Sequence, residues 1–175
     1  MKKLLIVFVL VTVFSTGTVF AQREDPRPDN FGIGVLGRFG GGWLGGTYGG
    51  AALALKIPNL PVYWGIDFDL YGDSYFRVGV TADFLNIFGG KFIPCIGWYW
   101  DLGAFAGLGF GNDRMDIDIG VRLPLGLTFQ PIEWFEIFLA WVPSIGVGIR
   151  TRLHNDDRAY LYGGWPFELG IRFWF

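Results

Sequence analysis

The chain has 175 residues, of which 51% are hydrophobic, 19% aromatic and only 17% charged, with 28 glycines and a formal net charge of −2. Soluble domains carry about 25% charged residues and about 7% glycine, so this composition excludes a disordered chain and a highly solvated surface. The lysines and arginines are scattered and form no basic stripe, which argues against a nucleic-acid-binding protein. The length predicts a single domain.

The N-terminus has the pattern of a secretory signal peptide. Lys2 and Lys3 precede an apolar run over residues 4–14, and residues 19–21 (VFA) suit a cleavage site. The apolar run is shorter than the ~20 residues that a transmembrane helix needs. We therefore expect residues 1–21 to be removed, which takes away two lysines and no acidic residue and shifts the net charge from −2 to −4.

Residues 22–30 are polar and contain two prolines, which predicts an extended leader. Residues 31–175 then show an alternation of apolar with small or charged side chains, clearest in 76–84 and 167–175. Successive side chains of a strand face opposite ways, and the 3.6-residue period of amphipathic helices is not sustained anywhere. We therefore predict one all-β domain over residues 31–175.

Eight strands are predicted, at residues 31–39, 47–57, 62–71, 75–85, 92–110, 115–129, 134–150 and 160–175. An even number places both termini on one side of a membrane barrel. The segment 92–110 is about twice as long as a spanning strand needs to be, so ten strands are an alternative. The expected turns on the side of the termini are near Asn59, Gly89 and Pro131, and the loops of the other side are near Gly42, Asp73, Asn112 and Asp156.

The face opposite the apolar one distinguishes a soluble barrel from a membrane barrel. A soluble lipocalin-like barrel would expose a second face rich in Lys and Glu, but here that face consists of Gly, Ala and Thr with isolated charges. Such a face suits the narrow interior of an eight-stranded barrel. We therefore predict an antiparallel up-and-down transmembrane β-barrel whose inward charges are paired, because unpaired buried ions cost several kcal/mol each. The predicted lumen charge network consists of Arg38, Lys56, Asp67, Asp69, Arg77, Asp83, Asp101, Asp116, Asp118, Arg122, Glu136, Glu168 and Arg172. Two further cations, Lys91 and Arg150, are expected near the rims.

One contact within this network can be predicted from a turn. A tight turn at Asp73 sets Asp69 opposite Arg77 on the neighbouring strand, where the two would form a cross-strand ion pair.

Aromatic residues near the strand ends predict two interfacial girdles. The interfacial aromatics on the side of the termini are Trp64, Trp134 and Trp174. Those toward the other rim are Tyr48, Tyr75, Tyr160 and Tyr162.

The end of the chain resembles a known signal. Residues Phe167, Leu169, Ile171, Phe173 and Phe175 resemble the C-terminal assembly signal of bacterial outer-membrane barrels. The chain after the signal peptide resembles small eight-stranded barrels of the OmpX, OmpA and OmpW type in length and pattern. Residues 123–143 are similar to a segment of spirochaete-type outer-membrane barrels, which often carry an acidic residue where Ala140 stands here. The resemblance implies a bacterial outer-membrane location, with outer-membrane lipid and the barrel assembly machinery as partners.

Catalytic and metal-binding motifs are weak. The run Gly32-x-Gly34-x-x-Gly37 matches a dinucleotide fingerprint but lacks the preceding strand and following helix that such a site needs. His154 has acidic neighbours but no nucleophile, and one cysteine with one histidine cannot supply a zinc or copper site. We therefore expect no enzyme activity, no metal and no cofactor.

Three functions remain open. The first is a structural or envelope-maintaining barrel with an ion-paired interior and an exposed surface. The second is an OmpW-like port for a small apolar ligand, which would leave through the wall near Pro124 or Pro143, because proline cannot donate ladder hydrogen bonds. The third is an adhesin-like surface protein that acts through its loops.

Overall fold

The structure, a computed structural model, describes residues 27–42, 47–72, 74–111, 114–152 and 155–175. The predicted signal peptide and the first part of the leader, residues 22–26, lie outside the described residues. No helix in the described part of the chain is long and apolar enough to cross a membrane.

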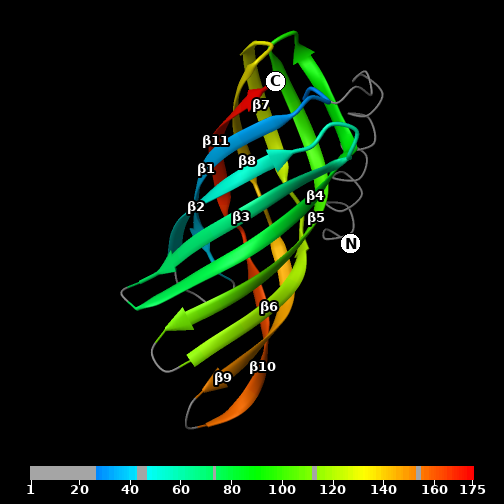
Figure 1. Cartoon of the computed structure of the whole chain (residues 1–175). Helices are drawn as coiled ribbons and strands as arrows, with labels where there is room; N and C mark the ends of the chain where they lie inside the picture. Colours follow the sequence, from blue (N-terminus) through cyan, green and yellow to red (C-terminus); the bar gives the residue numbers. More distant parts are fainter. Residues whose placement is uncertain (1–26, 43–46, 73, 112–113, 153–154) are drawn as a thin grey trace, which may run out of the picture.

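The described residues form one antiparallel sheet that curls into a barrel (Figure 1). Its strands are β1 (Gly32–Gly41), β2 (Thr47–Lys56), β3 (Val62–Tyr71), β4 (Tyr75–Ile93), β5 (Ile96–Gly111), β6 (Arg114–Arg122), β7 (Leu125–Ile132), β8 (Phe135–Trp141), β9 (Ser144–Arg152), β10 (Asn155–Gly164) and β11 (Phe167–Trp174). Consecutive strands are hydrogen-bonded neighbours over most of the sheet, and β1 pairs with β11 to close the ring.

Eleven elements make eight barrel strands because three long strands are each interrupted by a proline. The interruptions are Pro124 between β6 and β7, Pro143 between β8 and β9, and Pro166 between β10 and β11. The pairing register is the same on both sides of each interruption. Each proline carbonyl also accepts a backbone hydrogen bond of 2.8–2.9 Å from a neighbouring strand. The prediction of eight strands is therefore confirmed, and the ten-stranded alternative is wrong.

The register of the pairs fixes the shape of the barrel. Successive pairs of residues can be followed from strand to strand once around the barrel, starting at Gly32 of β1. The last pair reaches Gly42, so the strands are staggered by ten residues over one full turn around the barrel. The pairs are Gly32–Lys56, Lys56–Tyr63, Tyr63–Asp83, Asp83–Gly103, Gly103–Arg122, Arg122–Ser144, Ser144–Gly164 and Gly164–Gly42. For eight strands, this stagger corresponds to a strand tilt of about 40° and a backbone radius of about 8 Å. The interior is thus only wide enough to be filled by side chains.

The two ends of the barrel differ. We name the end where β1 begins and β11 ends the terminal mouth; the connections 57–61, 94–95 and 133–134 lie there. The opposite end, with the connections between β1 and β2, β3 and β4, β5 and β6, and β9 and β10, is the loop mouth. Here β9 and β10 project as a hairpin beyond the other strands (Figure 1). The strand that contains β10 begins at Asn155, five residues before its predicted start.

The predicted turn near Gly89 is wrong. β4 continues to Ile93, and the chain reverses at residues 94–95. Gly89 and Gly90 pair with Tyr99 and Trp98 of β5. A glycine pair is common in turns, but in a strand it also makes room for large aromatic rings on the neighbouring strand. The turn expected near Pro131 lies at residues 133–134.

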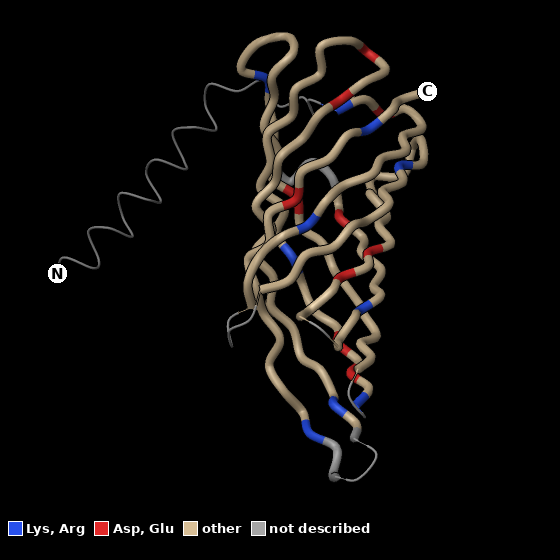
Figure 2. Tube along the Cα trace, turned by 90° about the vertical axis from the view of Figure 1, so that its left-hand side faces the viewer, with Lys and Arg blue, Asp and Glu red and all other residues tan. Residues whose placement is uncertain are grey.

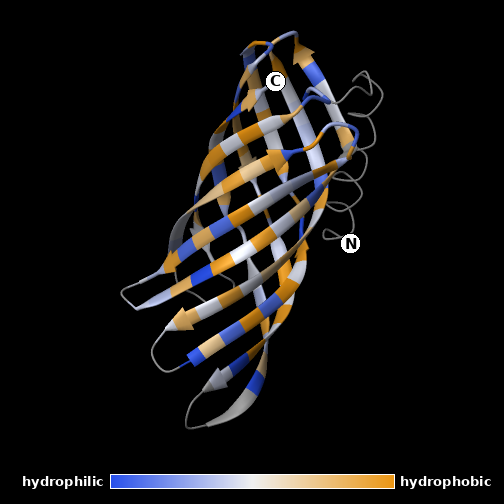
Figure 3. Cartoon of the chain, in the orientation of Figure 1, coloured by the Kyte–Doolittle hydropathy of each residue, from blue (hydrophilic) through white to orange (hydrophobic). Residues whose placement is uncertain are grey.

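The two faces of the sheet have opposite character. Charged residues occur along the whole length of the barrel (Figure 2), yet the strands alternate residue by residue between apolar and polar (Figure 3). The large apolar side chains point outward and are exposed: Ile119 exposes 62% of its surface and Val147 59%. The strand alternation predicted from the sequence is confirmed, and the lipocalin-like arrangement, with the apolar face inside, is excluded.

Candidate functional site in the barrel lumen

All thirteen residues of the predicted lumen charge network lie on the inner face. Twelve of them are buried, and the Asp83 side chain exposes only 14% of its surface. They point inward because each occupies the strand parity opposite to the outward apolar residues. The barrel therefore brings residues from all eight of its strands together in one narrow channel.

The side chain of Arg77 on β4 lies in the middle of the lumen and binds carboxylates of two other strands. Its Nε and Nη2 donate three hydrogen bonds of 2.7–3.2 Å to Asp118 on β6. Its Nη1 donates to Asp67 on β3 at 2.6 Å and lies 3.5 Å from Asp69. The structure thus contains the predicted Asp69–Arg77 pair, and Asp69 and Arg77 are opposite each other in the β3–β4 ladder.

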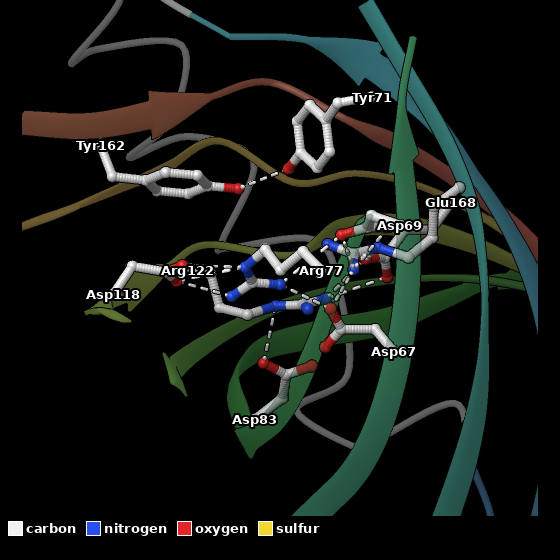
Figure 4. A network of polar contacts seen from close by, with 10 residues as sticks. Asp67, Asp69, Tyr71, Arg77, Asp83, Asp118, Arg122, Tyr162 and Glu168 are labelled. Atoms are coloured by element: carbon white, nitrogen blue, oxygen red, sulfur yellow. Dashed lines mark hydrogen bonds and ion pairs between the residues drawn. The ribbon is translucent and has the colours of Figure 1, made fainter. Parts of the chain in front are cut away.

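Two further arginines extend this cluster across the channel (Figure 4). Arg38 on β1 lies 2.8 Å from Asp67, 3.0 Å from Asp69 and 3.2 Å from Glu168 on β11. Arg122 on β6 lies 2.9 Å from Glu168 and 3.1 Å from Asp83. We call the three arginines and their five carboxylates the central network. Its members are Arg38, Asp67, Asp69, Arg77, Asp83, Asp118, Arg122 and Glu168.

Inward glycines make room for these large side chains. A Cβ at Gly79 would lie 2.7 Å from Arg77 Nη1 and from Asp67 Oδ2, and one at Gly107 would overlap the Arg77 guanidinium. Two cavities beside the central network measure about 10 and 30 Å³, which is room for one or two water molecules. The middle of the lumen is therefore filled.

An aromatic layer covers the central network toward the loop mouth. Tyr48 and Tyr71 stack with ring centroids 4.8 Å apart, the Tyr71 and Tyr162 hydroxyls are 3.3 Å apart, and Phe105 packs 5.3 Å from Tyr162. Nearer the rim, Tyr75 donates a hydrogen bond of 3.0 Å to Asp116.

The expectation that four tyrosines form a lipid-facing girdle at this rim is therefore wrong. Tyr48, Tyr75, Tyr160 and Tyr162 share the parity of the luminal charges and line the lumen. Their hydroxyl groups require polar partners, which lie inside.

At the terminal mouth, Glu136 accepts a hydrogen bond of 2.9 Å from Arg172 and one of 3.0 Å from the Trp174 indole N–H. The interpretation of Trp174 as an interfacial aromatic is consequently wrong: it is 3% exposed and lies on the inner face with Arg172. Trp64 and Trp134 do face outward, and Trp134 exposes 56% of its surface. The apolar residues of the predicted assembly signal lie outward along β11 and at the chain end.

A cation outside the predicted network comes from the leader. Arg27 reaches into the terminal mouth and donates hydrogen bonds of 2.7 and 2.9 Å to the two carboxylate oxygens of Asp101. Two residues on, Asp29 accepts a hydrogen bond of 2.6 Å from Lys56, and this bond together with the Lys56 charge holds the pKa of Asp29 below its usual range. The predicted network had eight acids and five bases, with Lys91 and Arg150 expected near the rims, so the remaining excess of one acid was the signal that a further cation was missing.

Arg150, which the sequence placed near a rim of the lumen, lies at the loop mouth. It donates hydrogen bonds of 2.9 and 3.1 Å to Asp116 and exposes 30% of its side chain. No group of three or more His, Cys, Asp or Glu placed to hold a metal ion occurs in the described segments.

A closed ring with an apolar exterior and a charged, filled interior defines this fold as a transmembrane β-barrel, because only a lipid environment accommodates such an outer face. No protein-family model and no curated protein sequence matches the chain. Its structure is similar to the crystal structure of Neisserial surface protein A (NspA), with a TM-score of 0.49 and 11% identity over 85% of this chain and 98% of that one. It is also similar to the N-terminal β-barrel domain of Pseudomonas aeruginosa OprF, with a TM-score of 0.40 and 13% identity over 82% and 97% of the two chains.

Proposed function

We propose that the protein is an integral barrel of a bacterial outer membrane, exported with a cleaved signal peptide, and that its role in the envelope is structural. The terminal mouth would face the periplasm, since outer-membrane barrels have short turns and both termini on that side. The observation that carries this proposal is the central network, which occupies the middle of the lumen.

The contacts of the central network support a lumen closed to ions. An ion that crossed it would have to displace Arg77 from Asp118 and Asp67, where it donates four charge-assisted hydrogen bonds. Such bonds are about twice as strong as neutral ones. Because Arg38 shares Asp67 and Asp69 with Arg77, moving one arginine also disturbs the second.

The OmpW-like port has less support. A ligand leaving sideways needs a gap in the wall, but at Pro124 and Pro143 the register is continuous and the proline carbonyls are hydrogen-bonded across the interruption. The cavities of about 10 and 30 Å³ beside the central network are also too small for an organic ligand.

Conductance in planar lipid bilayers tests the proposal. We expect the wild type to show no stepwise conductance. The double variant Arg77→Ser/Asp118→Ser removes a pair of opposite charges from the central network and should conduct small ions. The matched control, Arg150→Ser/Asp116→Ser, removes an equivalent pair at the loop mouth and should stay closed.

Stepwise conductance of the wild type would refute the closed lumen. A silent wild type that copurifies with a stoichiometric apolar molecule would instead favour the port.

A further inference from the structure

We propose that the terminal mouth contains a guanidinium-binding site, formed by Asp101, Tyr99 and Tyr63, and that Arg27 of the chain's own leader is its resident occupant. This site lies outside the central network and goes beyond the structural role proposed above. Residues 27–30 of the leader would then act as a tethered plug of the periplasmic opening.

The contacts of Arg27 match what a guanidinium group requires. Both terminal nitrogens bind the two oxygens of Asp101, in the bidentate geometry that the planar guanidinium provides. The Arg27 side chain exposes only 1% of its surface and that of Asp101 only 2%. The pair is therefore withdrawn from water, where charged hydrogen bonds gain strength.

Two aromatic rings complete the site. The guanidinium carbon of Arg27 lies 4.1 Å from the centre of the Tyr99 ring and 5.3 Å from that of Tyr63. Both distances fall within the range of cation–π attraction. An ammonium group is a compact, strongly hydrated charge that can neither bind two oxygens in parallel nor stack in this way, so the geometry selects arginine over lysine.

A second contact holds the leader across the opening. Asp29, whose side chain is 69% exposed, binds the buried ammonium group of Lys56. The leader thus descends from solvent at Asp29 to full burial at Arg27 within three residues. Because Arg27 is attached to the barrel through β1, its effective concentration at the site is high, and a free guanidinium can occupy the site only when Arg27 is absent.

Chemical rescue tests the site in the full chain folded in detergent micelles. We expect Arg27→Ala to raise the unfolded fraction about tenfold or more at a fixed temperature, because a buried carboxylate loses two charged hydrogen bonds. The unfolded fraction is read from the two electrophoretic bands of unheated and heated samples. Millimolar ethylguanidinium, far below denaturing concentrations, should reverse this loss saturably, whereas ethylammonium should not.

Two controls use the same assay. The wild type should not respond to ethylguanidinium, since Arg27 fills the site. The variant Arg27→Ala/Asp101→Asn should not respond either, because the carboxylate that binds the guanidinium is gone.

Several results would overturn the proposal. One is an Arg27→Ala protein that is as stable as the wild type, and another is a folded variant that ethylguanidinium does not stabilise. Equal binding of ethylguanidinium to the wild type would show that the leader does not occupy the site. If Arg27→Ala does not fold, Arg27→Lys provides the test: it keeps the charge but should still be less stable than the wild type, and equal stability would refute the selectivity for guanidinium.

Discussion

Replacing Arg77 with alanine should strongly destabilise the barrel. Arg77 donates four hydrogen bonds to Asp118 and Asp67, and at about 1.5–3 kcal/mol for each bond to a charged group the gross loss is about 6–12 kcal/mol. The net loss is smaller, because the variant no longer buries the guanidinium and water can enter the vacated volume. Breaking a buried ion pair by removing one partner typically costs about 3–5 kcal/mol, and we expect a value near the lower end of that range.

Urea unfolding of the barrel in lipid vesicles, followed by the electrophoretic shift, measures this loss. Arg150→Ala is the matched control, since Arg150 also binds a carboxylate twice but is partly exposed at the loop mouth. Because Arg150 is partly exposed and the buried Asp116 keeps its hydrogen bond from Tyr75, we expect a smaller loss of about 1–2 kcal/mol. In the double variant Arg77→Ala/Asp118→Asn, the two losses should not add, because both substitutions remove the same bonds. Two results would refute the assignment of Arg77 as the centre of the lumen. One is additivity of the losses in unfolding free energy from Arg77→Ala and Asp118→Asn, and the other is an Arg77→Ala barrel as stable as the Arg150→Ala barrel.

Two other predictions concern a glycine and the leader. Gly34→Ala should reduce the folded fraction sharply, because the added Cβ would lie 2.6 Å from the backbone oxygen of Ile171. The control Gly37→Ala should fold normally, since the nearest atom to its Cβ is 4.0 Å away. Equal folding yields of the two variants would contradict this prediction. Because Lys56 lowers the pKa of Asp29, this contact stabilises the folded protein above the unfolded-state pKa and is lost as the pH falls through the folded-state pKa. Carboxyl NMR should show Asp29 titrating at higher pH in Lys56→Met than in the wild type, and identical titrations would exclude the contact in solution.

The strand faces could be predicted because alternation leaves little freedom. Once Asp69 and Arg77 are placed around the turn at Asp73, every neighbouring side chain on β3 and β4 follows by parity. The inward position of the charges required no knowledge of their partners. Their pairing across the channel, such as Arg77 with Asp118 on a strand that is not its neighbour, depends on the curvature and stagger of the closed ring, which alternation does not encode.

The errors arose where a residue type has two structural uses. Gly89 and Gly90 suggested a turn but pair with Tyr99 and Trp98 within a long hairpin. Trp174 was assigned to the membrane interface by its position near the chain end, although its parity already placed it with Arg172 inside the barrel.

The burial of Arg27 could not be predicted, because composition describes a segment and not its contacts. Residues 22–30 are polar and rich in proline, features of an extended and solvated segment. Nothing local in that sequence distinguishes Arg27, which is buried, from a solvated arginine. Only the excess of carboxylates in the lumen, far along the chain, indicated that a cation was needed.

The pairing of β1 with β11 has a consequence for how the barrel forms. Gly32 and Trp174 are partners in this ladder although 142 residues separate them, so the seam has the longest chain closure in the protein and a correspondingly high entropic cost. Until the seam forms, both strands are open edges, and an open edge exposes unsatisfied backbone groups that hydrocarbon does not tolerate. Because β11 pairs with both β1 and β8, a barrel that lacks β11 leaves these two strands without their shared neighbour. Sealing of the seam is thus expected to be late and cooperative, with both edges disappearing in a single step.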